Sequence, residues 1–223
     1  MTATTRSTAM LRARLRNVYW IGGGSGGGKS AIARRLAATY GLSVYATDDV
    51  MLDHARRSTP GDAPELARFM EMGMDERWVN RSPDTMLDTF HWYRGEGFAL
   101  IVEDLLRLSA DGGVVAEGFR LLPHLVEPLL EDRNHAVWLL PTPRFRWAAF
   151  NSRGTAWDIA NRTSDPERAQ RNLLERDRMF TDRLVAETRR LGLPAVELDT
   201  MSEDVLFRIV AEKFALERAS TSS

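Results

Sequence analysis

Eight residues near the start of the chain have the types and spacing of a phosphate-binding loop. Gly23 to Ser30 matches the pattern G-x-x-x-x-G-K-S, in which glycines let backbone N–H groups approach a polyphosphate closely. In such a loop Lys29 reaches the β- and γ-phosphates, and the hydroxyl of Ser30 ligates Mg²⁺. We expect nine residues to bind the nucleotide: Gly23, Gly24, Ser25, Gly26, Gly27, Gly28, Lys29, Ser30 and Ala31.

The sequence on either side of the loop supports this interpretation. The β-branched and aromatic run at 18–21 predicts a strand before the loop, and residues 31–38 predict a helix after it. The positive end of that helix dipole would then face the anion. Lys29 is also one of two lysines, the other being Lys213, in a chain that otherwise uses arginine. A compact ammonium group is therefore kept where the motif requires one.

Acidic residues follow two further predicted strands and could act on the transferred group. Asp48 and Asp49 end the short strand 43–47, and Glu117 ends the apolar strand 114–117. Ligands of open α/β sheets bind at the carboxyl ends of the strands. We therefore expect Asp48 to orient or deprotonate an acceptor hydroxyl, Asp49 to contact the acceptor, and Glu117 to hold Mg²⁺ through water or position the acceptor. Alternatively, the two aspartates only cap the helix that follows them.

A lid that carries arginine is predicted over residues 150–166. Phosphoryl transfer spreads negative charge over the transferred group, so an enzyme needs cations that arrive with the nucleotide. We expect Arg153 and Arg162 to supply them as catalytic residues, because the segment around them is polar. The alternative is an ordinary exposed helix, since acids and bases alternate over residues 165–190.

Two arginines outside the lid are candidates for binding the acceptor. Arg57 closes the helix after the aspartate pair, and Arg120 follows the third strand. Either guanidinium could bind an anionic acceptor, although Arg120 could instead neutralise Glu117.

The elements that must position these residues form an alternating series of strands and helices, which predicts an α/β domain. Beyond the first strand and its helix, the pattern predicts helices over 50–57, 121–130 and 202–217 and strands over 43–47, 114–117, 135–140 and 193–199. Residues 65–110 are helical in pattern with interruptions near prolines and glycines.

We expect one domain over residues 17–218, with a helical cap at about 58–97 and the lid at about 150–166. Residues 1–16 carry four arginines and no acid, which suits a flexible basic arm, and residues 219–223 should be a disordered tail.

Composition excludes several classes of function. The chain of 223 residues has a formal net charge of −1, which gives no reason to expect nucleic-acid binding. It has no cysteine, so disulfides and thiolate metal sites are excluded. No apolar run reaches the ~18 residues that a membrane helix needs. We expect a cytoplasmic protein, monomeric or homodimeric, whose partner is a small molecule.

At the level of combined motifs, the chain resembles the nucleoside-monophosphate-kinase-like branch of P-loop kinases, which includes shikimate kinase, gluconate kinase and chloramphenicol phosphotransferase. The glycine loop, Thr47-Asp48-Asp49 and the run Glu117 to Pro123 look most like 2-phosphoglycerate-kinase-type proteins. The resemblance implies a three-layer P-loop NTPase fold. Its five-stranded parallel sheet would have the order 2-3-1-4-5, with a cap and an arginine-bearing lid. Nucleotide kinases carry Asp-Gly-Phe-Pro-Arg at the third strand, whereas this chain has Glu117-Gly118-Phe119-Arg120 without the proline.

The function expected from the residues and the resemblance is transfer of the γ-phosphoryl group of ATP, with Mg²⁺, to a hydroxyl of a small metabolite, natural product or antibiotic. One alternative is a nucleoside monophosphate kinase. An alternative from another class is a nucleotide-dependent switch or ATPase module that acts on a protein partner.

Overall fold

The computed structural model describes residues 3–108, 112–153 and 158–216. Five strands form one parallel sheet in the order β2-β3-β1-β4-β5, which confirms the predicted α/β class and strand order and is consistent with the P-loop NTPase fold. The strands are β1 (Val18–Gly23), β2 (Ser43–Ala46), β3 (Val114–Glu117), β4 (Ala136–Pro141) and β5 (Ala195–Leu198).

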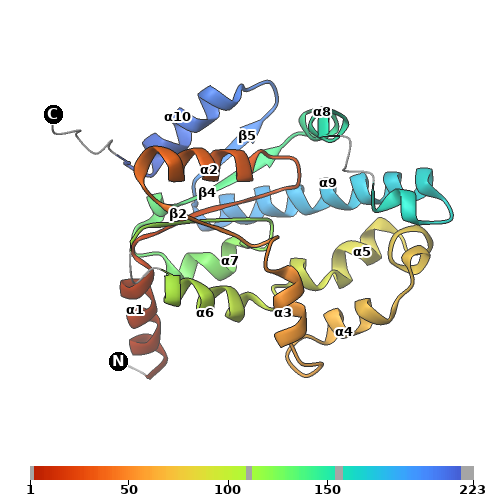
Figure 1. Cartoon of the computed structure of the whole chain (residues 1–223), viewed down its shortest axis with the longest axis horizontal. Coiled ribbons are helices and arrows are strands. Elements are labelled where there is room, and N and C mark those ends of the chain that lie inside the picture. Colours follow the sequence, from red (N-terminus) through yellow and green to blue (C-terminus); the bar gives the residue numbers. More distant parts are fainter. Residues whose placement is uncertain (1–2, 109–111, 154–157, 217–223) are drawn as a thin grey trace.

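Helices cover both faces of the sheet (Figure 1). Helices α2 (Lys29–Tyr40) and α10 (Glu203–Lys213) cover one face, and α6 (Phe98–Leu108), α7 (Pro123–Val126) and α9 (Pro166–Leu191) cover the other. The arrangement follows from strand geometry, because successive side chains of a strand point to opposite faces.

Alternation in β1 shows this separation of the two cores. Trp20 packs in the core that contains Phe180 of α9, whereas the next residue, Ile21, packs in the core that contains Ile32 of α2. All six residues of β4 are buried, as expected for a strand covered on both faces.

The segment predicted as a cap, residues 58–97, is a series of short helices connecting the β2 side of the sheet to α6 (Figure 1). Several contact the long helix α9, and together they enclose a small core around Phe69, Trp78 and Leu173. The elements of the segment are α4 (Pro64–Glu71), the π turn η1 (Glu76–Asn80), α5 (Pro83–Thr89) and the 3-10 turn η2 (His91–Arg94), and helix α3 (Met51–Arg57) precedes it.

The N-terminal segment differs from the flexible arm expected over residues 1–16. It forms helix α1 (Ala3–Leu15), and Leu15 is buried in the main core. Arg12 Nε donates to the carbonyl of Pro128 at 2.7 Å, and Arg14 donates to that of Leu106. The anchoring leucine and these two bonds tie the helix to the domain. The disordered tail predicted at 219–223 lies outside the described residues.

The lid segment is described in part. Helix α8 (Pro143–Arg153) leads into it and the 3-10 turn η5 (Ala160–Arg162) follows, while residues 154–157 are not described. Ala160 is buried in the small core of the cap, and Ser164 N–H donates to Asp75 at 2.8 Å. The described end of the segment therefore contacts the cap.

Two further 3-10 turns precede β4, η3 (Glu127–Leu129) and η4 (Arg133–His135).

Among the helices of the described ranges, none combines the length and the apolar character needed to cross a membrane.

Candidate functional site

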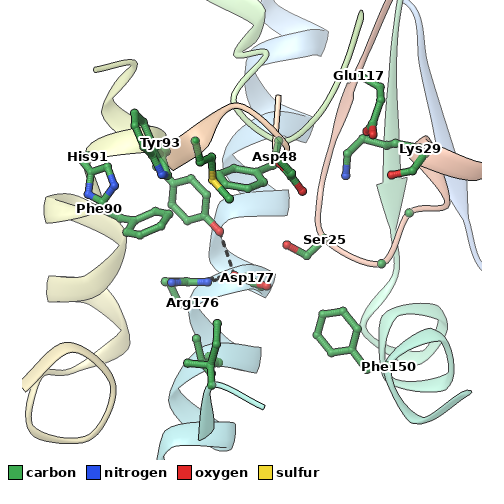
Figure 2. A pocket seen from close by; sticks show the side chains of 18 of the residues that line it. Ser25, Lys29, Asp48, Phe90, His91, Tyr93, Glu117, Phe150, Arg176 and Asp177 are labelled. Atoms are coloured by element: carbon green, nitrogen blue, oxygen red, sulfur yellow. Dashed lines mark hydrogen bonds and ion pairs between the residues drawn. The ribbon is translucent and has the colours of Figure 1, made fainter. Parts of the chain in front are cut away.

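A cavity of about 490 Å³ lies between the glycine loop and the cap (Figure 2). One wall carries the residues predicted to handle phosphate, and the opposite wall is mainly aromatic. From the first wall come Ser25, Gly26, Gly27, Gly28, Lys29, Ser30, Asp48 and Glu117. From the second come Phe69, Trp78, Phe90, His91, Trp92, Tyr93, Phe119, Leu173, Arg176 and Asp177.

The glycine loop leaves the start of α2 open to a ligand. Gly28 is the N-cap residue, with a φ of 73° and no side-chain hydrogen bond to the helix. A Cβ added at Gly28 would meet nothing within 4 Å, so the space in front of it is empty of protein atoms. The first N–H groups of a helix have no partner within the helix. The loop therefore offers donors, dipole and space to an anion.

Arg146 of α8 is buried against the glycine loop and forms a hydrogen bond with it. It is 1% exposed, and its Nε donates to the carbonyl of Ser25 at 3.2 Å. Its Nη2 donates to the carbonyl of Pro141 and to the hydroxyl of Thr181 on α9. The role of Arg146 depends on contacts with Ser25 and Thr181, which are far away in the sequence, so it could not be inferred from local spacing.

Lys29 and Ser30 begin helix α2 and line the cavity. Lys29 is 8% exposed, and its Nζ donates to the carbonyl of Gly24 at 2.9 Å. Ser30 donates to the carboxylate of Glu117, which is 3% exposed at the end of β3. Burial raises the pKa of Glu117, and the bond from Ser30 and the charge of Lys29 oppose this rise. A buried carboxylate of this kind is suited to a nearby cation. The remaining members of the predicted nucleotide set, Gly23, Gly24 and Ala31, occupy the end of β1 and the first turn of α2.

The register of the sheet brings together Asp48 and Glu117, which we call the strand-tip acids. Ala46 of β2 pairs with Glu117, and the N–H of Thr47 donates to the Glu117 carbonyl at 2.9 Å. Gly118 then turns with a φ of 146°, and its N–H donates to Ile21 of β1 at 3.1 Å. The tips of three adjacent strands thus meet beside the glycine loop, as predicted for residues at the carboxyl edge of a parallel sheet.

Asp48 faces the open cavity from the tip of β2 (Figure 2). Asp48 is exposed toward the cavity, and the protein that surrounds its carboxyl on the other sides reduces hydration and raises its pKa, against the attraction of Lys29 and Arg120. A raised pKa makes a carboxylate a stronger base. Asp49 is exposed in the turn before α3 and is not among the residues that line the cavity.

Arg120 is buried behind the site and does not line the cavity. Its guanidinium stacks on the ring of Trp92, with Cζ 3.9 Å from the centroid, and its Nη1 donates to the carbonyl of Thr47 at 3.2 Å. Its Nη2 donates to His54 Nδ1 at 2.9 Å, so His54 donates through Nε2 to Asp104 at 2.8 Å. Burial lowers the pKa of Arg120 to about 10, so it remains charged at neutral pH. Arg120 supports the turn that carries Asp48.

Of the other predicted arginines, Arg57 and Arg162 do not line the cavity either. Arg57 forms ion pairs with Asp53, Glu103 and Asp104 at the surface. Arg162 is exposed at the end of η5, and the side chain of Arg153 lies outside the part of the chain whose side chains are described. The arginine that does line the cavity is Arg176 of α9.

Sequence reasoning missed the aromatic wall. Its residues come from α4, η1, η2, β3's following turn and α9, so only the fold brings them together. The ring of Tyr93 stacks on Phe180 with centroids 3.7 Å apart and planes inclined by 4°, and it meets Phe90 edge-on at 4.8 Å. Arg176 lies against three rings of this wall and is 7% exposed.

The residues present fit a magnesium ion held mainly by nucleotide phosphates. Within the described residues, no group of three or more His, Cys, Asp or Glu side chains could hold a metal ion alone. Mg²⁺ in phosphate chemistry is usually bound by one or two protein oxygens together with substrate phosphates and water. The adjacent Ser30 hydroxyl and buried Glu117 carboxylate offer such oxygens.

Comparison with known proteins adds no relative: no protein-family model matches the chain, and the search of curated proteins finds no match.

Proposed function

We propose that this chain is an ATP- and Mg²⁺-dependent phosphotransferase that moves the γ-phosphoryl group to a hydroxyl of a small-molecule acceptor. The observation that supports this most is that Lys29, Asp48 and Glu117 line one cavity, opposite a wall that can hold a second molecule. A phosphate site without a facing pocket would suit a hydrolase or a switch equally well.

Each residue of the first wall has a role in this proposal. The backbone N–H groups of the loop and the first turn of α2 bind the phosphates, and Lys29 exchanges the carbonyl of Gly24 for a phosphate oxygen. Ser30 and Glu117 would hold Mg²⁺, which neutralises charge on the phosphates when bound. Asp48 accepts or orients the proton of the acceptor hydroxyl, and its raised pKa favours that role.

Substitution of Lys29 by Met tests the phosphate site. We expect Lys29→Met to abolish transfer and to weaken ATP binding in calorimetry with Mg²⁺, while circular dichroism stays unchanged. Lys213→Met is the matched control, because Lys213 is the other lysine and ends α10 away from the cavity lining. Wild-type protein that gives no heat with millimolar ATP and Mg²⁺ would refute the proposal.

Substitution of Asp48 by Asn separates a transferase from a switch. In a transferase, Asp48→Asn should lower turnover far more than ATP affinity, whereas Asp49→Asn should change both little. The assay is ADP release stimulated by a panel of hydroxylated metabolites, nucleosides and antibiotics, with the product identified by mass. Acceptor-independent hydrolysis that survives Asp48→Asn would instead favour the ATPase or switch alternative.

A further inference from the structure

The half of the cavity that faces the loop is lined by packed aromatic rings, and we call this half the ring slot. Phe90, Tyr93 and Phe119 contact one another, with centroids 4.8 Å apart for Phe90 and Tyr93 and 5.7 Å apart for Tyr93 and Phe119. Tyr93 is fixed from behind by its stack on Phe180. Because the rings support each other, the slot needs little ordering when a ligand enters. Rigid aromatic walls bind flat, apolar bodies by area and by ring contacts.

The charge in this half of the cavity is already balanced. Arg176 donates to Oδ1 of Asp177 from Nε at 3.0 Å and from Nη2 at 2.7 Å, and Tyr93 donates to the same oxygen at 2.9 Å. Burial opposes ionisation of Asp177, but Arg176 overcomes it and holds the pKa of that carboxyl below its usual value. The pair is therefore ionised and neutral in sum at physiological pH.

An anionic acceptor would find no unbalanced positive charge among the described residues of this wall. Arg176 is neutralised by Asp177, His91 is neutral, and Lys29 belongs to the phosphate wall. The acids Asp48 and Glu117 face the same space. A carboxylate or phosphate on the acceptor would lose water and meet like charge, and burial of an uncompensated charge costs several kcal/mol.

Two buried nitrogen atoms of the wall have no partner within the described part of the chain, His91 Nδ1 and Arg176 Nη1. Burial lowers the pKa of His91 to about 3, so its ring is neutral. After a small shift of the His91 or Arg176 side chain, either nitrogen could form a hydrogen bond with an uncharged oxygen substituent of a ligand. A neutral hydroxyl or carbonyl oxygen could therefore satisfy these nitrogens without bringing a net charge into the wall.

We infer that the acceptor is an uncharged alcohol built on an aromatic or flat apolar ring, not a sugar phosphate, a hydroxy acid or a nucleotide. This inference rests on the proposed function, because it assigns the acceptor of the same reaction. The aromatic wall holds the ring, and the Arg176–Asp177 pair selects against negative charge.

Binding of two matched probes in the presence of Mg²⁺ and a non-hydrolysable ATP analogue tests the inference, because the filled phosphate loop then cannot take up the anionic probe. 2-Phenylethanol and 3-phenyllactate both carry a phenyl ring and a hydroxyl, but only the second is an anion. We expect ligand-detected NMR to show binding of 2-phenylethanol and roughly tenfold weaker binding of 3-phenyllactate, a difference of ~1.4 kcal/mol. Equal or tighter binding of 3-phenyllactate, or no binding of 2-phenylethanol, would overturn the inference.

Removing the balancing charge should abolish the preference. Asp177→Asn leaves Arg176 unneutralised, so 3-phenyllactate should gain roughly tenfold in affinity while 2-phenylethanol changes little. Asp182→Asn on the same helix is the matched control, because that carboxylate is 63% exposed and pairs with Arg178. An Asp177→Asn protein that folds and keeps the original preference would contradict the role of the pair.

A second variant covers the case in which Asp177→Asn does not fold. Phe119 is only partly buried, and Phe119→Ala should weaken 2-phenylethanol binding while leaving ATP binding by calorimetry unchanged. Unchanged 2-phenylethanol binding in this variant would overturn the ring slot. The two proposals fail separately: loss of the probe preference with ATP binding intact refutes the acceptor assignment, and absence of ATP binding with the preference intact refutes the kinase.

Discussion

Gly118 is the position at which a single methyl group should damage both the fold and the site. It follows Glu117 directly and lies against Thr47, which precedes Asp48. Its φ is 146°, in the region that side chains disfavour, and a Cβ built there would lie 1.7 Å from Thr47 Oγ1 and 2.9 Å from Thr47 Cβ. Gly118→Ala must therefore push apart the two turns that carry the strand-tip acids.

The cost has two components that the structure lets us separate. Disfavoured backbone dihedrals cost roughly 1–3 kcal/mol, and forcing a methyl group into a packed site costs about 1–3 kcal/mol more. We expect a total loss of about 2–6 kcal/mol in the free energy of unfolding, or roughly 10 °C in Tm near the middle of that range for a chain of this length. Gly41→Ala should cost about 1–2 kcal/mol, because Gly41 has a φ of 69° but no atom within 4 Å of an added Cβ.

Urea unfolding followed by tryptophan fluorescence measures these losses. Gly112→Ala, in the turn before the same strand, has open space and no positive φ, and it should stay within about 0.5 kcal/mol of wild type. In the double variant with Thr47→Ala, the loss of the hydroxyl should recover about 1–2 kcal/mol of the cost. If Gly118→Ala is no more destabilising than Gly112→Ala, or if Thr47→Ala recovers nothing, the reasoning about these turns is refuted.

Two further predictions concern the phosphate wall. Because the fold raises the pKa of Glu117 above its ordinary value of 4.5, the stabilising contribution of this group is lost as pH rises from about 4.5 through the raised pKa. Glu117→Gln should remove this decline in stability and be at least as stable as wild type at pH 7. The variant should nevertheless gain less stability than wild type when Mg²⁺ and ATP are added. Thermal unfolding over a pH series, with and without Mg²⁺ and ATP, measures both effects. Arg146→Lys cannot donate to Ser25 and Thr181 together, so ATP affinity in calorimetry should fall roughly fivefold, whereas Arg144→Lys at an exposed position should change nothing. A nucleotide affinity unchanged by Arg146→Lys would show that the hydrogen bonds of Arg146 do not hold the loop in its binding conformation.

The sheet and the phosphate loop were predictable because their signals are local. The loop needs glycine at fixed offsets, since backbone atoms themselves do the binding, and the apolar runs at 114–117 and 135–140 have the length of buried strands. The order of the strands came from the resemblance of the motifs and is confirmed.

Helix α9 contradicts one alternative that the sequence left open. Alternating acids and bases over residues 165–190 allowed an ordinary exposed helix as the alternative to an arginine-bearing lid, yet Leu173, Phe180 and Leu184 are buried at helical spacing. Arg176 and Asp177 fall on that same apolar stripe. Charged neighbours on a buried stripe must pair with each other, and that is what distinguishes them from the exposed arginines around them.

The acceptor half of the cavity could not be predicted in this way. Backbone N–H groups that bind phosphate come from consecutive residues, so they leave a pattern in the sequence. Side chains that bind an acceptor need only their end groups close together in the folded protein, and their positions in the sequence can be far apart. Phe90, Phe119 and Arg176 come from three separate segments, and nothing in their spacing links them before the sheet and the cap have formed. The two walls share the cavity but are supported by different hydrophobic cores, since Phe69 and Trp78 pack in the cap and Ile32 packs beneath the loop. Substitutions in the cap should therefore alter acceptor choice without disturbing the phosphate wall.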